Sequence, residues 1–174
     1  MTARREELLE KAYGFVLEHG LADLSLRPLA QSIGSSPRVL LYLFGSKDGL
    51  VRELLARARR DELAALEGSD GDLDAATGRL WEWLSAPEHR PLLVLWVEAY
   101  ARSLVDPDGP WGGYARQTVE DWLEVLAKAQ PPAVRRSRAG LIERTRALAL
   151  VRGAMLDLLA TGEEARVTGS LRPR

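Results

Sequence analysis

Residues 25–50 read SLRPLAQSIGSSPRVLLYLFGSKDGL, and this stretch decides the fold. Its first apolar residues recur at the spacing of one buried helical face: Leu26, Leu29, Ala30 and Ile33. Ser25 is a suitable cap for this helix, and Gly34 can take the left-handed backbone that ends it. Ser36 and Pro37 predict a second helix start, because a hydroxyl caps free N–H groups and proline fits the first helical position.

The second helix of this pair is short and has two different sides. The apolar residues on one side are Leu40, Leu43 and Phe44. The residues largely on another side are Arg38, Leu41 and Tyr42. Gly45 ends the helix, and Ser46 can cap a third one that begins at Lys47. Two short helices joined by a tight glycine turn have the geometry of a helix-turn-helix, in which the second helix enters a DNA major groove.

The run from Leu8 to Leu55 resembles the DNA-binding domain of TetR-type bacterial transcription regulators. The positions of the first helix that match are Leu8, Leu9, Ala12, Phe15, Val16 and Gly20. Those that match further on are Ser25, Leu29, Ala30, Gly34, Ser36, Leu40, Phe44, Ser46, Lys47, Asp48 and Leu50. Three positions depart: Ser35 replaces a usual buried Val, Leu41 stands where Tyr is most frequent, and Leu43 where His or Tyr is common. The resemblance implies an effector cavity and a dimer interface in the C-terminal part.

Candidate DNA contacts follow from the chemistry of the side chains in this stretch. Arg38 is the best candidate for a base edge, because a guanidinium can bond both acceptors of a guanine, although it could equally hold a phosphate. Lys47 at a helix N-terminus is a natural phosphate clamp. The remaining candidates are Ser25 and Arg27 for phosphate, Ser36 and Tyr42 for phosphate or a base, and Pro37 for a thymine methyl. The serines at 25, 36 and 46 are all expected to cap helices.

Composition limits the other possibilities. A chain of 174 residues with 46% hydrophobic content can bury a substantial core. It has no cysteine and only two histidines, which excludes disulfides and thiolate catalysis, offers no clustered metal ligands and predicts no cofactor. A charged N-terminus without an apolar stretch predicts a cytoplasmic protein. Residues 1–60 carry ten Lys and Arg against seven Asp and Glu, whereas 61–174 carry fourteen against eighteen, so the basic surplus lies with the predicted DNA-binding part.

The whole chain is predicted to be all-α. Strong helix breakers divide the C-terminal part into helices over 73–85, 87–105, 110–130 and 133–161, after a connecting helix over about 50–67 and a loop at 68–72. We therefore expect a helix-turn-helix domain over 1–49 and an effector-binding and dimerisation domain over 50–174. The tail from Glu163 onward gives no clear pattern.

All five tryptophans lie in the C-terminal part. Plain core packing is the more common fate of such residues, but they could also line an apolar ligand cavity. The candidates for the cavity are Trp81, Trp96, Tyr100 and Trp122. Glu98 follows an apolar run and either faces such a cavity or pairs with Arg102 one turn away, and the pairing is the preferred interpretation.

The last long helix is apolar around nearly its whole circumference and therefore needs cover on two sides. The core of the chain can supply one cover, and a second subunit is the natural source of the other. The predicted dimer-interface residues on this helix and the one before it are Trp111, Val119, Ala147, Val151, Ala154 and Leu158. A dimer would place two recognition helices about one DNA turn, ~34 Å, apart on a palindromic operator.

The sequence thus predicts a homodimeric, ligand-responsive DNA-binding regulator, with a repressor preferred over an activator. An enzyme is disfavoured, because there is no glycine-rich phosphate loop, no nucleophile elbow and no spaced acid/base pair. The alternative is a helical protein-binding adaptor without specific DNA affinity, which Leu41 and Leu43 favour slightly. The identities of the effector, the operator and the regulated genes are not encoded in any recognisable motif.

Overall fold

A computed structural model describes residues 2–21, 24–65 and 72–171. Those residues form helices and connecting turns without a β-strand, which confirms the all-α fold class. Two compact units make up the chain: unit 1 comprises residues 1–61 and 91–117, and unit 2 comprises residues 62–90 and 118–174. The functional division at residue 49 stays a prediction. The loop predicted at 68–72 lies outside the described residues except for Asp72.

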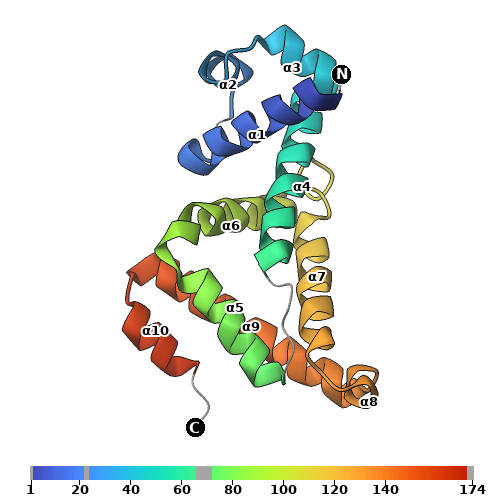
Figure 1. Cartoon of the computed structure of the whole chain (residues 1–174), viewed down its shortest axis with the longest axis vertical. Helices are drawn as coiled ribbons and strands as arrows, with labels where there is room; N and C mark the ends of the chain where they lie inside the picture. The colour runs from blue at the N-terminus through green and yellow to red at the C-terminus, as the bar shows by residue number, and fades with distance from the viewer. Residues whose placement is uncertain (1, 22–23, 66–71, 172–174) are drawn as a thin grey trace. The chain divides into compact units, whose positions relative to one another are not determined.

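Unit 1 contains the predicted helix-turn-helix together with α6. Its helices are α1 (Thr2–His19), α2 (Leu26–Ser32), α3 (Pro37–Phe44), α4 (Lys47–Ala65, as far as residue 61) and α6 (Arg90–Val105, from residue 91). Figure 1 shows the short turn between α2 and α3, with α1 beside them and α4 following α3. Fully buried leucines hold these helices together: Leu8, Leu21, Leu29, Leu40, Leu50, Leu54 and Leu95.

A polar network joins α1 to α4 within unit 1. The Arg57 guanidinium donates to Glu10 at 2.6 Å and also bonds Asp61, and it lies 4.8 Å from the centre of the Tyr13 ring. The Tyr13 hydroxyl donates to Asp61 at 2.9 Å. The bond to Glu10 is the main reason that the pKa of Arg57 is raised above its ordinary value. The network fixes the angle at which α4 leaves the helix-turn-helix.

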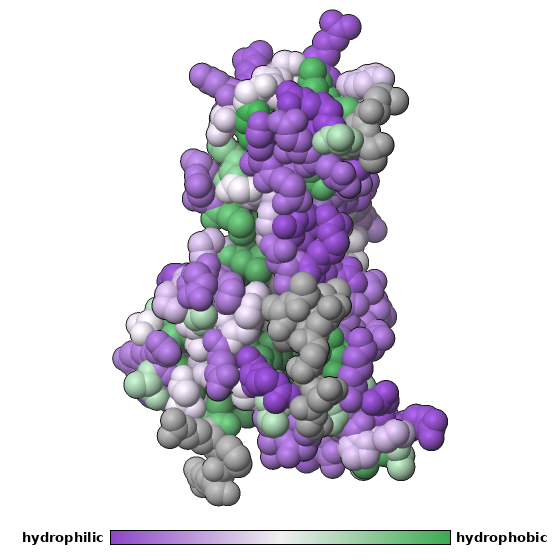
Figure 2. Space-filling model, in the orientation of Figure 1, coloured by the Kyte–Doolittle hydropathy of each residue, from purple (hydrophilic) through white to green (hydrophobic). Residues whose placement is uncertain are grey.

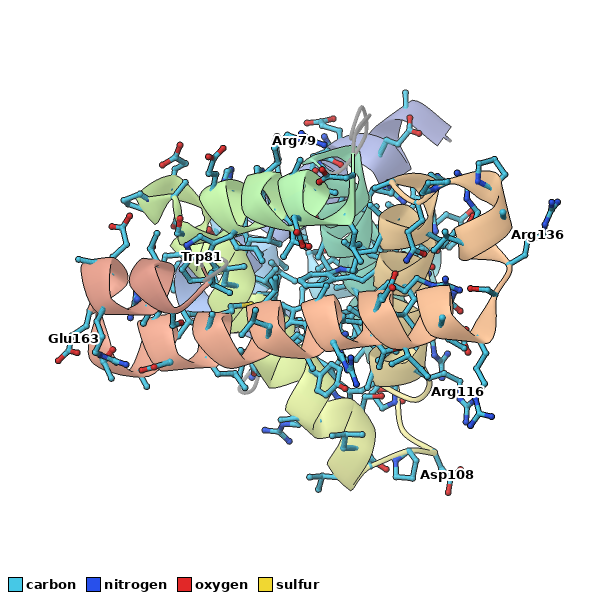
Figure 3. The ribbon with its side chains drawn as sticks, turned by 90° about the horizontal axis from the view of Figure 1, so that it is seen from below. Arg79, Trp81, Asp108, Arg116, Arg136 and Glu163 are labelled. Carbon is cyan, nitrogen blue, oxygen red and sulfur yellow. The ribbon has the colours of Figure 1, made fainter. Side chains whose placement is uncertain are left out.

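Unit 2 holds the remaining helices. They are α5 (Leu73–Ser85), the 3₁₀ turn η1 (Pro87–His89), α7 (Tyr114–Lys128, from residue 118), α8 (Pro132–Arg135), α9 (Arg138–Thr161) and α10 (Glu164–Ser170). In Figures 1 and 3, α5 and α10 both run beside α9, and contacts join each of them to it. Buried side chains of α9, among them Val151 and Met155, form the middle of this core.

Three predicted helices need correction. The helix predicted over 87–105 is split, because His89 turns back to bond the Trp83 carbonyl at 2.7 Å and stacks on the Trp83 ring. The helix predicted from residue 110 begins only at Tyr114, since Gly113 has a left-handed backbone (φ 79°). The helix predicted over 133–161 is broken before Arg138, where the Ser137 hydroxyl caps a new helix by accepting from the Gly140 N–H at 2.9 Å.

The tail, which has no clear sequence pattern, contains α10. Val167 is buried, and the Arg166 guanidinium bonds both carboxylate oxygens of Asp157 on α9, at 2.6 and 2.8 Å. These bonds hold the pKa of Asp157 below its ordinary value. The bonds from Arg166 and the burial of Val167 attach the short helix to unit 2, because seven residues alone are too few for a stable helix. Among the described helices, none is both long and apolar enough to cross a bilayer.

Candidate nucleic-acid interface

The helix-turn-helix has the predicted geometry. Helix α2 gives way at Ile33 to Gly34, whose left-handed backbone (φ 66°) turns the chain toward α3. Gly45 (φ 77°) ends α3 in the same way. Leu29 and Ala30 on α2, and Leu40 and Phe44 on α3, are buried. Because this inner face is fixed against the core, the other face of α3 is held outward.

The exposed face of α3 carries the predicted contact residues. Tyr42 is 74% exposed and Leu41 41% exposed, and Arg38 and Val39 are exposed as well. Pro37 is half-buried at the first position of the helix. The surface of this part of unit 1 that Figure 2 presents is mainly hydrophilic. An exposed helix face with a guanidinium, a phenol and apolar groups can bond base edges and pack against thymine methyls.

The cations of the region fall into two groups. Arg4 pairs with Glu7 at 2.8 Å, and Arg5 pairs with Glu53 at 2.7 Å while lying over the Phe44 ring. By contrast, the exposed side chains of Arg27, Arg38 and Lys47 make no ion pair or hydrogen bond with any described residue. Exposed cations without internal partners keep their full capacity to bond phosphate.

The three serines predicted as caps behave differently. The Ser36 hydroxyl accepts from the Val39 N–H at 3.3 Å, and the Ser46 hydroxyl accepts from the Gly49 N–H at 2.9 Å. Ser25 occupies the N-cap position with extended backbone, but its side chain makes no capping bond, so that prediction is wrong. The exposed Ser25 hydroxyl therefore remains available to another acceptor or donor.

This difference gives a matched test. Ser36→Ala is expected to lower the free energy of unfolding by about 0.5–2 kcal/mol, because the Val39 N–H loses its acceptor. Ser25→Ala should change it by less than about 0.5 kcal/mol, because no capping bond is lost. Urea unfolding followed by circular dichroism measures both. Equal losses in the two variants would contradict the assignment of the caps.

The four residues predicted to line a ligand cavity are divided between the two units. Trp96 and Tyr100 lie in unit 1, with ring centres 4.9 Å apart, and Trp122 lies in unit 2 below the Arg152 guanidinium, 5.5 Å from it. Of the four, Trp81 lines a cavity of about 1070 Å³ in unit 2. The sequence did not mark the other residues of that cavity, because exposed carboxylates and leucines are ordinary on helix surfaces.

The residues predicted at a dimer interface are mostly inside the chain. Trp111, Val151, Ala154 and Leu158 are buried, which leaves them little surface to offer a second subunit. Val119 and Ala147 are half-buried, and Ala147 lines the cavity named above. Among the apolar residues that α9 exposes, Ile142, Ala149, Gly153 and Leu156 lie on the side away from these buried residues, and Leu141 and Leu150 are exposed as well.

Glu98 does not make the predicted pair with Arg102. Its Oε2 accepts the Leu21 N–H at 3.0 Å, immediately after Gly20 ends α1, and its Oε1 is buried without a hydrogen-bond partner. The contact joins residues 77 positions apart, so no local sequence pattern could predict it. Glu98 thereby ties α6 to the connection that leads into α2.

Comparisons with known proteins point the same way. A scan against models of protein families finds no match. The HTH-type transcriptional repressor Rv1474c of Mycobacterium tuberculosis is 28% identical to the chain over its whole length, which spans 87% of that protein. The HTH-type transcriptional regulator BetI of Stenotrophomonas maltophilia is 30% identical over 52% of the chain, and the match spans only 58% of BetI.

Solved structures show the same fold. A TetR transcription regulator from Haloarcula marismortui has a TM-score of 0.74 and 19% identity, with 98% of this chain and 94% of that one covered. The multidrug binding protein EbrR, complexed with imidazole, has a TM-score of 0.68 and 24% identity, with 100% and 92% covered. Together with the turn at Gly34 and the buried inner face of α3, these structures show that the chain has the fold of TetR-type bacterial transcription regulators, and the similar proteins named as HTH-type regulators are in keeping with it.

Proposed function

We propose that this protein is a ligand-responsive repressor that binds a palindromic operator as a homodimer. The observation that carries the proposal is the outward face of α3, where Arg38 and Tyr42 project from a helix whose other side is buried. The name of Rv1474c as a repressor supports repression over activation. A repressor works beside its operator, which is in keeping with a cytoplasmic location.

The candidate contacts divide by chemistry. Arg38 reads a base edge, with Pro37, Ser36 and Tyr42 beside it on the same helix or at its cap. Lys47, in the first turn of α4, and Arg27, in the first turn of α2, bond phosphates on either side of the groove, and the exposed Ser25 hydroxyl supports Arg27. The positive ends of both helices strengthen these phosphate contacts.

Dimerisation uses the exposed apolar side of α9. Ile142, Ala149, Gly153 and Leu156 follow one another at spacings of seven, four and three residues, so they share one face of the helix. Ile142 and Leu156 are nearly half exposed, at 43% and 48%. Small residues between them permit close approach of a second copy of the same helix. This exposed face of α9 is the proposed contact between subunits, in place of the buried residues Val151, Ala154 and Leu158.

Effector binding releases the operator by population shift, because the ligand favours a form in which the two recognition helices no longer fit successive grooves. Solved structures of EbrR hold imidazole and proflavin, which supports a small-molecule effector here. None of the relatives reported above is named as an enzyme, and their names as HTH-type regulators do not favour the adaptor alternative.

A gel-shift experiment with the promoter region of the protein's own gene tests the proposal. Arg38→Ala is expected to weaken specific binding by about 1–3 kcal/mol and to relax the sequence preference at one position. Lys47→Ala should weaken binding to all duplexes alike and reduce the salt slope by about 1.

Arg136→Ala is the matched control for both variants. Arg136 is an exposed arginine of unit 2 that points into solvent in Figure 3, and its loss should leave binding unchanged. Binding that is insensitive to salt, or that survives both Arg38→Ala and Lys47→Ala, would contradict the proposed interface.

A further inference from the structure

Unit 2 contains a cavity of about 1070 Å³ whose ligand the fold does not specify. Its walls come from α5, α8, α9 and α10, and from the residues that connect α7 to α8. The apolar side chains that line it are Leu73, Trp81, Val134, Ala147, Leu150 and Leu171. The volume is at the upper end of the range for small-molecule sites, and an apolar floor of this kind suits an organic ligand.

Hydrogen bonds fix the walls before any ligand binds. The Trp81 indole N–H donates to the Thr168 hydroxyl at 2.9 Å, which ties α5 to α10. Figure 3 shows Trp81 directed from α5 toward these neighbouring helices. The buried Gln130 side chain donates to the Gly140 carbonyl at 3.0 Å and to Glu143 at 3.3 Å, which ties the end of α7 to α9. A site held in this way loses little conformational entropy on binding.

The polar residues of the cavity carry mainly negative charge. Among the described residues, four carboxylates line it, at Asp72, Asp74, Glu82 and Glu143, against the single guanidinium of Arg146. Asp72 caps α5 through the Ala75 N–H, and Glu143 accepts from Gln130. Asp74, Glu82 and Arg146 make no side-chain bond to another described residue. The two α5 carboxylates are therefore free to pair with a bound cation.

We propose that this cavity binds an amphipathic organic cation, whose apolar body packs on Trp81, Ala147 and Leu150 while its positive charge faces Asp74 and Glu82. An indole attracts cations more strongly than other aromatic rings do, so Trp81 contributes to both parts of the ligand. An organic anion of the same shape is repelled by the net negative charge of the cavity and is therefore excluded. The inference rests on the proposed function, because it names the chemical class of its effector.

Isothermal titration of the full chain with two ions of matched shape tests the charge preference. Tetraphenylphosphonium is expected to bind about tenfold more tightly than tetraphenylborate, because only the sign of the charge differs between them. Equal binding of the two ions, tighter binding of the borate, or binding of neither ion would overturn the proposal.

Two double variants locate the site. Asp74→Asn with Glu82→Gln should weaken phosphonium binding about fivefold, as the loss of two partly exposed charge pairs predicts. Glu88→Gln with Glu124→Gln removes two exposed carboxylates of unit 2 outside the cavity and should leave binding unchanged. If both pairs of substitutions have the same effect, the cation is not bound in this cavity.

The operator is tested separately from the cation. A chain that binds the phosphonium ion but no operator contradicts the proposed function and leaves the cavity assignment standing. A chain that binds operator with the expected salt dependence but does not discriminate the two ions contradicts the cavity assignment alone.

Discussion

Leu40→Ala is expected to lower the free energy of unfolding by about 2–5 kcal/mol. Leu40 is 1% exposed and forms the inner face of α3 together with Phe44. Its truncation removes apolar contacts and leaves a cavity that the short turn at Gly34 gives little room to close. Since small domains are stable by only about 5–15 kcal/mol, the loss is a large share of the total.

Leu41→Ala is the matched control, one residue along the same helix. Leu41 is 41% exposed, so its truncation should change the free energy of unfolding by less than about 0.5 kcal/mol. Urea unfolding of both variants, with the denaturant slope compared to that of the wild type, makes the measurement. A larger loss at Leu41 than at Leu40 would mean that α3 presents the opposite face to solvent, and Arg38 would then point inward.

The helix-turn-helix could be predicted closely because its signals are local. Gly34 and Gly45 each take a left-handed backbone that ends a helix, and Pro37 fixes the start of α3 with the cap of Ser36. Each of these residues acts on the adjacent helical turn, so the ends of the helices do not depend on the rest of the fold. The helix at Leu73–Ser85 agrees with its prediction for the same reason, since Asp72 caps it.

The C-terminal part was less predictable because its signals are tertiary. In α9 nearly every side is apolar, so the sequence could not tell the buried Val151 from the exposed Leu150. The break before α9 depends on a close approach: a side chain at Gly140 would meet the Val134 carbonyl at 2.1 Å. The sequence of the tail did not predict α10, because this helix is stabilised by Arg166 and Val167, whose partners lie elsewhere in the chain.

The two candidate sites also differ in whether their signals in the sequence are local or tertiary. The exposed cations of the helix-turn-helix could be named from their positions on a helix face, because that face follows from a period of 3.6 residues. The cavity could not, because Glu82 on α5, Gln130 after α7 and Thr168 on α10 come together only through tertiary packing. The aromatic residues of the sequence gave no reason to prefer Trp81, which lines the cavity, over Trp96 or Trp122, and its contact with a ligand stays a prediction.

Glu98→Ala is expected to lower the free energy of unfolding by about 1–3 kcal/mol. The Leu21 N–H would lose the carboxylate that accepts it at 3.0 Å, and Leu21 is only 2% exposed, so water replaces the bond poorly. Operator affinity should fall as well, at a temperature where the variant remains folded. The reason is that the lost bond holds Leu21, which follows α1 on the path of the chain to the helix-turn-helix of α2 and α3.

Two further variants separate this bond from other effects of position 98. Glu98→Gln should recover part of both losses, because its amide oxygen can accept the same N–H while its amino group replaces the buried Oε1, which has no partner. Arg102→Ala should change neither quantity, because the Arg102 side chain is exposed and bonds no described residue. Losses of equal size in Arg102→Ala and Glu98→Ala would restore the pairing that the helical spacing suggests. A Glu98→Gln variant no better than Glu98→Ala would show that charge, and not the bond to Leu21, is what position 98 contributes.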